Sequence, residues 1–259
     1  PLALVVSCNE NDGCMGFALD QVADALNILV ISEACQLKGF AGVCLNEVAC
    51  KNLARMVQLF RDAGLGVDYL GFFGHESLPF NGEDYTSFDT YLAMLNRAIV
   101  PLECKLSLQF GQKLVSDAGA LVARVLHVQR GEGTWSMMID AGLNDCGAPA
   151  FFQMKNEIIP VREDMYCERR EASVLGPHGG SADTFGSYVL PATLKAGDLV
   201  SIMNVGAYGS VMASTFGGRS LVPEIMVAAS QYAIIRRRLA VTEQMGWEAY
   251  PEWLESETR

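Results

Sequence analysis

Strand-like and helix-like segments alternate along the first 110 residues, and this alternation constrains the fold more than any other feature of the chain. Apolar runs suited to buried strands occur at residues 1–7, 39–45, 67–73 and 105–110. Between them, apolar residues recur at helical spacing in residues 17–31, 48–63 and 85–99. Repeated strand–helix alternation is the signature of a parallel α/β sheet or barrel. We therefore predict a partial TIM-like (β/α) barrel over residues 1–115.

The pattern changes after about residue 115. Short strand-like runs divided by turns follow at residues 121–129, 136–140, 157–160, 171–175, 199–203 and 223–229. No long helical pattern separates them, so we predict an antiparallel β domain over residues 116–232. Residues 233–259, which begin near the basic triplet Arg236–Arg238, are predicted to form a helical tail. A basic triplet on such a helix is usually a solvated face.

Composition narrows the classes of function. The chain of 259 residues has a formal net charge of −11, which argues against a nucleic acid as partner. No apolar run approaches the roughly 20 residues that a membrane-spanning helix needs, so no membrane is expected. The eight cysteines are scattered, without the paired spacing of a metal site. We therefore expect a cytoplasmic protein with reduced thiols, no disulfide scaffold and no bound metal.

Two glycine-rich turns stand out in the second half of the chain, at Gly176–Asp183 and Asn204–Gly209. Glycines at strand ends allow a ligand to approach the backbone closely and can expose amide N–H groups that suit anions. Tyr208, between glycines, can present its hydroxyl as a further donor. The alternative is a pair of ordinary β-turns with no ligand.

The chain begins within a buried-strand pattern, at Pro1–Ser7. The first residues of most domains are loosely held, so a core strand at the first position is unusual. We expect further sequence upstream, separated from this chain by truncation, cleavage or a split gene.

Several motifs carry a resemblance to a known family. Residues 139–145 read Ile-Asp-Ala-Gly-Leu-Asn-Asp, residues 176–177 read Gly-Pro, and residues 206–209 read Gly-Ala-Tyr-Gly. The last motif continues through Met212–Ser214, Arg219 and Pro223–Glu224. Their order and spacing resemble the fold-type III pyridoxal-phosphate decarboxylases, the diaminopimelate, ornithine and arginine decarboxylase group. The resemblance implies an alanine racemase/ornithine decarboxylase-like fold, and it covers only the C-terminal three-fifths of a typical member.

The resemblance implies pyridoxal 5′-phosphate as cofactor and assigns residues to it. Tyr208 and Gly206 match the segment that helps hold the cofactor phosphate, and Gly74 closes the stretch that matches the family's phosphate loop. Gln109 stands where the family has a glutamate for the pyridine nitrogen, which leaves that position uncharged. Gln112 replaces an arginine, so a positive charge toward the phosphate is lost.

The resemblance also locates the catalytic positions. The family's Schiff-base lysine lies in a segment that this chain does not contain. The family's catalytic cysteine and its neighbouring acid become Gly179–Gly180, which leaves adjacent His178 as a candidate substitute acid. Asp183 matches a family aspartate that can contact a partner's active site. The alternatives are that His178 is an exposed bystander and that Asp183 is a turn residue or helix cap.

Three functions remain open. The first is an amino-acid decarboxylase chain that obtains its lysine from a missing segment or a partner chain. The second is a catalytically inactive pseudoenzyme that dimerises with an active paralogue and regulates it. The third is a scaffold or small-molecule binding protein with a repurposed pocket. The family resemblance implies a homodimer, or a heterodimer with a related decarboxylase chain.

Two spatial predictions follow from the resemblance. Tyr208, Gln109, Gln112 and the stretch Gly71–Gly74 should converge on one cleft. The loop Gly176–Asp183 should lie at a two-fold or pseudo-two-fold interface.

Overall fold

The computed structural model divides the chain into two compact units, Pro1–Leu114 and Val115–Arg259. Each unit is described by itself. The residues that the structure describes are 2–7, 21–31, 36–43, 47–73, 88–109, 111–131, 135–152, 155–162, 167–251 and 253.

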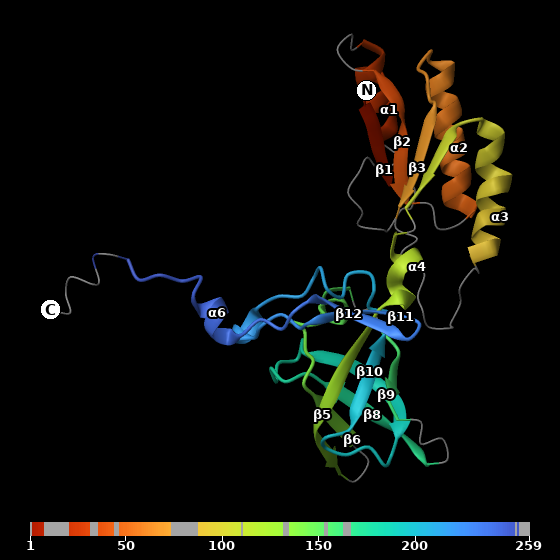
Figure 1. Cartoon of the computed structure of the whole chain (residues 1–259). Helices are drawn as coiled ribbons and strands as arrows, with labels where there is room; N and C mark the ends of the chain where they lie inside the picture. The colour runs from red at the N-terminus through yellow and green to blue at the C-terminus, as the bar shows by residue number, and fades with distance from the viewer. Residues whose placement is uncertain are drawn as a thin grey trace. The chain divides into compact units, whose positions relative to one another are not determined.

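The first unit contains a four-stranded sheet in the order β1-β2-β3-β4, in which all neighbouring strands are parallel (Figure 1). Its strands are β1 (Leu2–Ser7), β2 (Leu37–Val43), β3 (Tyr69–Phe73) and β4 (Lys105–Leu108). Its helices are α1 (Val22–Ile31), α2 (Glu47–Asp62), α3 (Phe88–Ile99) and the short η3 (Val100–Leu102). Helix and strand alternate in the predicted order, so the predicted α/β class is confirmed.

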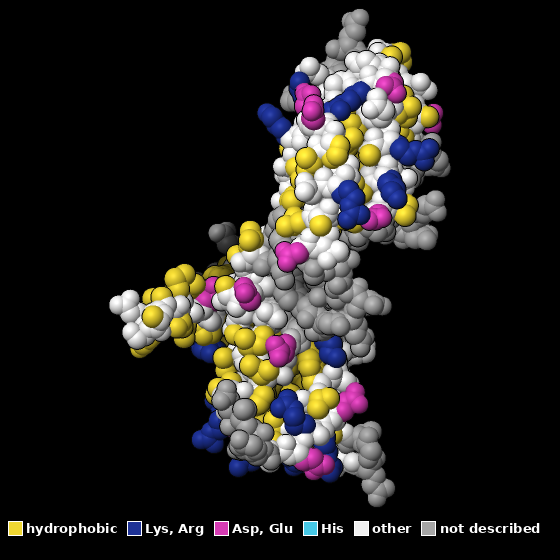
Figure 2. All heavy atoms as spheres, turned by 90° about the vertical axis from the view of Figure 1, so that its right-hand side faces the viewer, with side chains coloured by type: hydrophobic (Ala, Val, Ile, Leu, Met, Phe, Trp, Pro, Cys, Tyr) yellow, Lys and Arg dark blue, Asp and Glu magenta, His cyan; other side chains and the backbone are white. Residues whose placement is uncertain are grey.

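The helix α2 shows why this part of the sequence folds as it does. Its buried side chains include Leu53, Val57 and Phe60, at the spacing of three to four residues that places them on one helix face. Phe60 meets Phe40 of β2 edge to face, with ring centroids 4.9 Å apart. Gly64, at φ 82°, follows the helix in the left-handed conformation that glycine adopts without strain. The core of this unit therefore lies between its helices and its sheet. On the face of α2 and α3 seen in Figure 2, Lys and Arg side chains are interspersed with apolar ones.

The second unit contains a six-stranded sheet in the order β7-β10-β5-β6-β8-β9. Its strands are β5 (Ala120–Arg130), β6 (Trp135–Ile139), β7 (Ile158–Pro160), β8 (Arg169–Leu175), β9 (Thr184–Pro191) and β10 (Leu199–Met203). The short helices of this unit include η4 (Ser116–Ala118), α5 (Ala148–Phe152) and η5 (Phe216–Gly218), and α4 (Gly111–Val115) spans the boundary between the two units. The predicted β domain is confirmed, with one addition: β6 and β8 pair in parallel, so the sheet is mixed. The most deeply buried apolar side chains of this sheet are Met137, Ile139, Val174, Leu190, Val200 and Ile202.

The C-terminal tail differs from the predicted helix. Residues 233–236 belong to the strand β12 (Gln231–Arg236), which pairs with β11 (Glu224–Ala228) in a separate antiparallel hairpin. The described helical segment of five residues in the tail is α6 (Val241–Met245). Tyr232, Ile234 and Ile235 are β-branched or aromatic, so they favour a strand over a helix. Across the part of the chain that the structure describes, no helix has the length and apolarity to cross a membrane.

Candidate functional site

The loop Gly176–Asp183 is folded around the carboxylate of Asp183. This side chain is only 2% exposed, and its two oxygens accept hydrogen bonds from two backbone amides. Leu143 N donates to Oδ1 at 2.8 Å, and His178 N donates to Oδ2 at 2.6 Å. The loop is also closed by Gly176 N, which donates to the Asp183 carbonyl at 2.9 Å. Asp183 therefore ties this loop to the segment that follows β6, and both of its oxygens serve that purpose.

Two glycines are required by the close approach of this carboxylate. A Cβ atom on Gly176 would lie 2.2 Å from Asp183 Oδ1, and one on Gly142 would lie 2.8 Å from the same oxygen. Neither distance is tolerated between non-bonded atoms, so any larger residue would displace Asp183. The glycines of these two motifs thus serve the packing of Asp183.

His178 is half-buried and hydrogen-bonded, which corrects the alternative of an exposed bystander. Its Nε2 lies 2.8 Å from Oδ1 of Asn144, and its ring meets Phe216 edge to face at 5.2 Å. Asn144 Nδ2 donates to Asp145 Oδ1 at 2.8 Å, so the amide turns its oxygen toward the histidine. With the amide in this orientation, Nε2 of His178 donates to Asn144 Oδ1.

The polar network continues into the segment after β6. Asp145 is 4% exposed and accepts a hydrogen bond from Gly142 N at 3.0 Å. Burial raises the pKa of Asp145, while the Gly142 hydrogen bond and the charge of Arg219 oppose this shift. Arg219 Nη2 in turn donates to the Asp140 carbonyl at 2.6 Å.

Ser214 extends the same network. Its backbone N donates to the Asn144 carbonyl at 2.8 Å. Segments 140–145, 176–183 and 214–219, all of which carry family motifs, therefore form one hydrogen-bonded cluster. Asn144 and Asp145 had not been predicted as site residues. The adjacent Asn-Asp pair after a buried strand was the sequence feature that could have indicated them. Their partners His178 and Arg219 are distant in sequence, so this feature alone did not identify a site.

Gly179 and Gly180 form an open corner of the same loop. No described atom lies within 4 Å of a Cβ built on either residue. Gly179 has φ 73°, the left-handed region that side-chain-bearing residues rarely adopt, whereas Gly180 does not have a positive φ. The two positions where the family resemblance places a catalytic pair thus have room for side chains, with backbone strain at the first.

The turn around Tyr208 is strained and tightly packed. Tyr208 has φ 29°, and its side chain lies at the surface with 36% exposure. Gly206 N donates to the Ser116 carbonyl at 2.9 Å, and Gly209 N donates to the Ala207 carbonyl. A Cβ on Gly206 would lie 1.9 Å from the Val115 carbonyl oxygen. The Gly206 N–H is therefore used inside the unit, and the assignment of Gly206 to the cofactor stays a prediction.

The remaining predicted cofactor residues belong to the first unit. Gln109 is exposed directly after β4, and its N donates to the Phe72 carbonyl at 3.1 Å. Gln112 on α4 is buried, with 6% exposure. Gly74 lies outside the described residues. Tyr208 belongs to the other unit, so its convergence with these residues stays a prediction.

A family model supplies the class of protein. The model described as "Pyridoxal-dependent decarboxylase, C-terminal sheet domain" matches residues 6–206. This match covers more than half of the chain, which therefore belongs to the pyridoxal-dependent decarboxylase family. The predicted membership of the fold-type III group is confirmed, and pyridoxal phosphate is the cofactor of this family.

Several similar proteins within this family are diaminopimelate decarboxylases. Diaminopimelate decarboxylase of Zymomonas mobilis is 26% identical, over 96% of this chain and 61% of the relative. The enzyme of the same name from Neisseria meningitidis is 32% identical, over 77% of this chain and 49% of the relative. A crystal structure of diaminopimelate decarboxylase from Helicobacter pylori complexed with L-lysine has the same fold, with a TM-score of 0.69 and 24% identity over 94% of this chain and 61% of that one. The chain thus spans about half to three-fifths of the length of these relatives.

The described residues fit the cofactor in part. Non-glycine residues in sparsely populated backbone regions cluster at ligand sites, and Tyr208 is such a residue with a surface side chain. The amides of Gly206 and Gly209 are bonded internally, and the Tyr208 side chain is the group of this turn that the family resemblance assigns to the phosphate. Among the described residues, no group of three or more His, Cys, Asp or Glu side chains is arranged to hold a metal ion.

Proposed function

We propose that this chain is the C-terminal part of a cytoplasmic, pyridoxal-phosphate-dependent amino-acid decarboxylase, with diaminopimelate as the favoured substrate. The lysine that binds the cofactor would come from a missing segment or a partner chain. The observation that carries the proposal is the hydrogen-bonded cluster of motif segments 140–145, 176–183 and 214–219. Asp183, Asn144 and Arg219 are its central connections. This cluster joins three segments whose motifs resemble those of the family.

The proposal assigns limited roles to residues of this chain. Pyridoxal phosphate, when bound, supplies the electron sink that carbon–carbon bond cleavage requires. Tyr208 would donate its hydroxyl to the phosphate, and Gln109 would hydrogen-bond the pyridine nitrogen without charge. His178 would exchange a proton through Nδ1, because its Nε2–H is directed at Asn144.

The unpaired edges of the sheet β1–β4 and of the hairpin β11–β12 support the proposal that another segment completes the fold. Within the described residues, β1 and β4 each have a strand partner on one side only, and a closed (β/α)₈ barrel has eight strands. The hairpin β11–β12 pairs with no other described strand and exposes Val227, Tyr232 and Ile234 by 65% or more. A lone two-stranded hairpin is marginally stable in water, so a covering segment would stabilise it.

The proposed assembly is a dimer. The family resemblance assigns the loop Gly176–Asp183 to the interface, where one chain contributes to the partner's site. The partner is a second copy of this chain or a related decarboxylase chain. The open space at Gly179 and Gly180 supports this assignment, because a partner residue can approach the loop there.

A complementation assay tests the proposed activity. This chain would be combined with the part of the Zymomonas mobilis relative that its match leaves uncovered, and CO₂ release from diaminopimelate would be measured with added cofactor. We expect release from the combination and none from either part alone. Tyr208→Phe should raise the cofactor concentration required, because the variant lacks the hydroxyl.

The pseudoenzyme remains the second candidate, and the uncharged positions Gln109, Gln112, Gly179 and Gly180 favour it. In that case the combination would assemble and bind the cofactor without releasing CO₂. Added to an intact diaminopimelate decarboxylase, this chain would then change the rate of that enzyme. That pair of results would contradict the proposed activity.

A further inference from the structure

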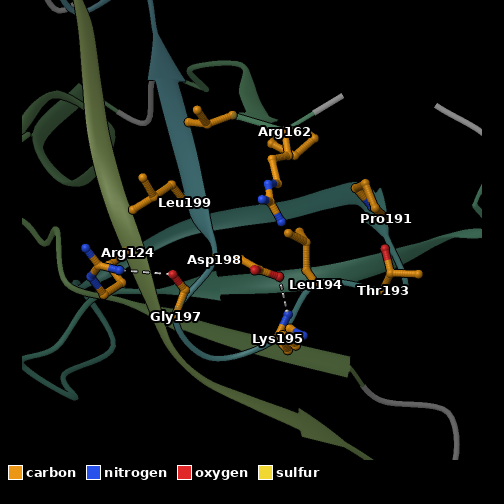
Figure 3. A pocket seen from close by; sticks show the side chains of 11 residues that line it. Arg124, Arg162, Pro191, Thr193, Leu194, Lys195, Gly197, Asp198 and Leu199 are labelled. Carbon is orange, nitrogen blue, oxygen red and sulfur yellow. Dashed lines mark hydrogen bonds between the residues drawn. The ribbon is translucent and has the colours of Figure 1, made fainter. Parts of the chain in front are cut away.

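A cavity of about 560 Å³ opens beside the strands β7, β9 and β10 of the second unit (Figure 3). This volume lies within the range of small-molecule sites, roughly 300 to 1,000 Å³. The charged and polar side chains of its wall are Arg124, Arg162, Thr193, Lys195 and Asp198. None of them belongs to the cofactor or catalytic residues predicted above.

Strand pairing positions Arg162 at this cavity. Pro160 of β7 pairs with Val200 of β10, and Val161 N extends the contact by donating to the Leu199 carbonyl at 3.0 Å. Arg162 follows immediately, and Figure 3 shows its side chain pointing into the cavity, toward the Lys195–Asp198 turn. Among the described residues, the Arg162 guanidinium has no hydrogen-bond or ion-pair partner.

The opposite wall is a rigid turn. Lys195 N donates to Asp198 Oδ2 at 3.0 Å, and Asp198 N donates to the Lys195 carbonyl at 3.1 Å. Arg124 Nη1 reaches across from β5 and donates to the Gly197 carbonyl at 3.0 Å. These bonds fix the turn before any ligand binds, which reduces the ordering cost of binding.

The charge of the cavity is opposite to that of the whole chain. Among the described residues that line the cavity, three cations, Arg124, Arg162 and Lys195, face one carboxylate, Asp198, whose Oδ2 is already hydrogen-bonded within the turn. The chain as a whole carries a net charge of −11. A locally positive concave site on an acidic protein attracts small anions, and the Arg fork binds carboxylate or phosphate with two hydrogen bonds.

We propose that this cavity binds a small organic anion. Its carboxylate or phosphate group is held by Arg162, with Lys195 and Arg124 adding positive charge. Its carbon skeleton lies against Pro160, Pro191 and Leu194, which supply apolar surface in the same wall. The inference rests on the second unit alone and does not depend on the proposed decarboxylase activity.

Titration of the purified chain tests the proposal. The probes are inorganic phosphate, the dicarboxylates glutarate and pimelate, and the uncharged analogue glutaramide. Binding is measured by calorimetry and by the amide NMR signals of β7 and β10. We expect saturable binding of the dicarboxylates, weaker binding of phosphate, which gains nothing from the apolar wall, and none of glutaramide. Binding should weaken as salt is added.

A charge-matched pair of variants decides the role of Arg162. Arg162→Gln should weaken dicarboxylate binding by about ten-fold or more, because a charged hydrogen bond is lost. Arg55→Gln removes the same charge from an exposed position of α2 and should leave the affinity unchanged. Equal weakening in both variants, no effect of Arg162→Gln, equal or tighter binding of phosphate, or absence of saturable binding by the dicarboxylates would each overturn the proposal.

Discussion

At the scale of single residues, the loop Gly176–Asp183 is held in its conformation although positions 179 and 180 lack the cysteine and the acid that the family resemblance places there. Asp183 holds the loop to Leu143 and to the His178 amide, while Gly179 and Gly180 leave open space. The fold of the loop therefore depends on the aspartate. No side chain at Gly179 or Gly180 takes part in the hydrogen bonds that hold the loop.

Side chains returned to these two glycines should have unequal effects. Gly180→Glu should change the free energy of unfolding by less than about 0.5 kcal/mol, because space is open and φ is not positive. Gly179→Cys should destabilise by about 1 to 2 kcal/mol, because its φ of 73° is strained for a side chain. Urea unfolding measures both changes, and a larger loss in Gly180→Glu would contradict the described loop.

Removal of the Asp183 charge should loosen the loop. In Asp183→Asn one of the two donating amides, at Leu143 or His178, would face an NH₂ group in place of an acceptor. Loss of a buried hydrogen bond to a charged group predicts destabilisation by about 2 to 3 kcal/mol. Asp117→Asn, at an exposed position of η4, is the matched control and should cost less than about 0.5 kcal/mol. Similar losses in the two variants would argue against the structural role of Asp183.

The buried thiol of Cys146 predicts a pH dependence of stability. Burial raises its pKa from the ordinary value of 9.0 to about 11. Above pH 9 the unfolded chain releases this proton while the folded chain retains it, so stability falls as the pH rises from 9 toward 11. The difference in unfolding free energy between the native chain and Cys146→Ala should shrink over this window, by up to about 1.4 kcal/mol per pH unit. A difference that does not vary between pH 8 and 10 would show that the thiol is not protected.

At the scale of elements, the hairpin β11–β12 contains the first residue of the basic triplet Arg236–Arg238, and its contacts stabilise the hairpin. Arg236 pairs with Glu224 across the two strands at 2.7 Å and donates to the Val222 carbonyl at 3.0 Å. Arg237 pairs with Glu243 at 2.6 Å, whereas Arg238 is exposed, so Arg236 and Arg237 both form ion pairs and Arg238 provides a control.

Arg236→Gln should therefore destabilise the hairpin more than Arg238→Gln. The first variant loses a half-buried ion pair and a hydrogen bond to backbone, which together are worth about 1 to 2 kcal/mol. Hydrogen exchange of the β11 and β12 amides measures the change. Equal exchange in the two variants would mean that the Arg236 contacts do not stabilise the hairpin.

Elements with strong periodicity could be predicted from the sequence, and those defined by distant partners could not. The helix α2 was predicted within one residue at each end, because its apolar spacing is regular. The strand β9 was missed, because its sequence contains Gly186 and begins directly after a glycine-rich loop. The tail was predicted as a helix although Ala233–Arg236 form a strand.

In the candidate site, too, residues whose roles depend on partners distant in sequence could not be predicted. Asp183 was predicted as a site residue, yet its role depends on Leu143, 40 residues away in sequence. The partner of His178 is Asn144, 34 residues away. Turn chemistry can indicate that such residues are special, but only the folded sheet brings the two loops together. The bonding of the Gly206 amide to Ser116 was beyond sequence reasoning for the same reason.

At the scale of the whole molecule, the proposed function requires a lysine from a missing segment or a partner chain. The family model matches residues 6–206, while the chain spans 61% of the Zymomonas mobilis relative. The sheet β1–β4 and the hairpin β11–β12 both have open edges among the described residues. Both features are consistent with the proposal that a missing segment or a partner chain supplies the cofactor lysine.

The most direct test of the account is to locate the lysine that binds the cofactor. The chain would be incubated with pyridoxal phosphate, reduced with borohydride and mapped by peptide mass spectrometry, alone and together with the complementing part of the relative. We expect no stoichiometric adduct on any of the six lysines of this chain alone, and one adduct on a lysine of the complementing part in the combination. A stoichiometric adduct on a lysine of this chain by itself would contradict this expectation, because the chain would then possess the cofactor lysine that we propose it lacks.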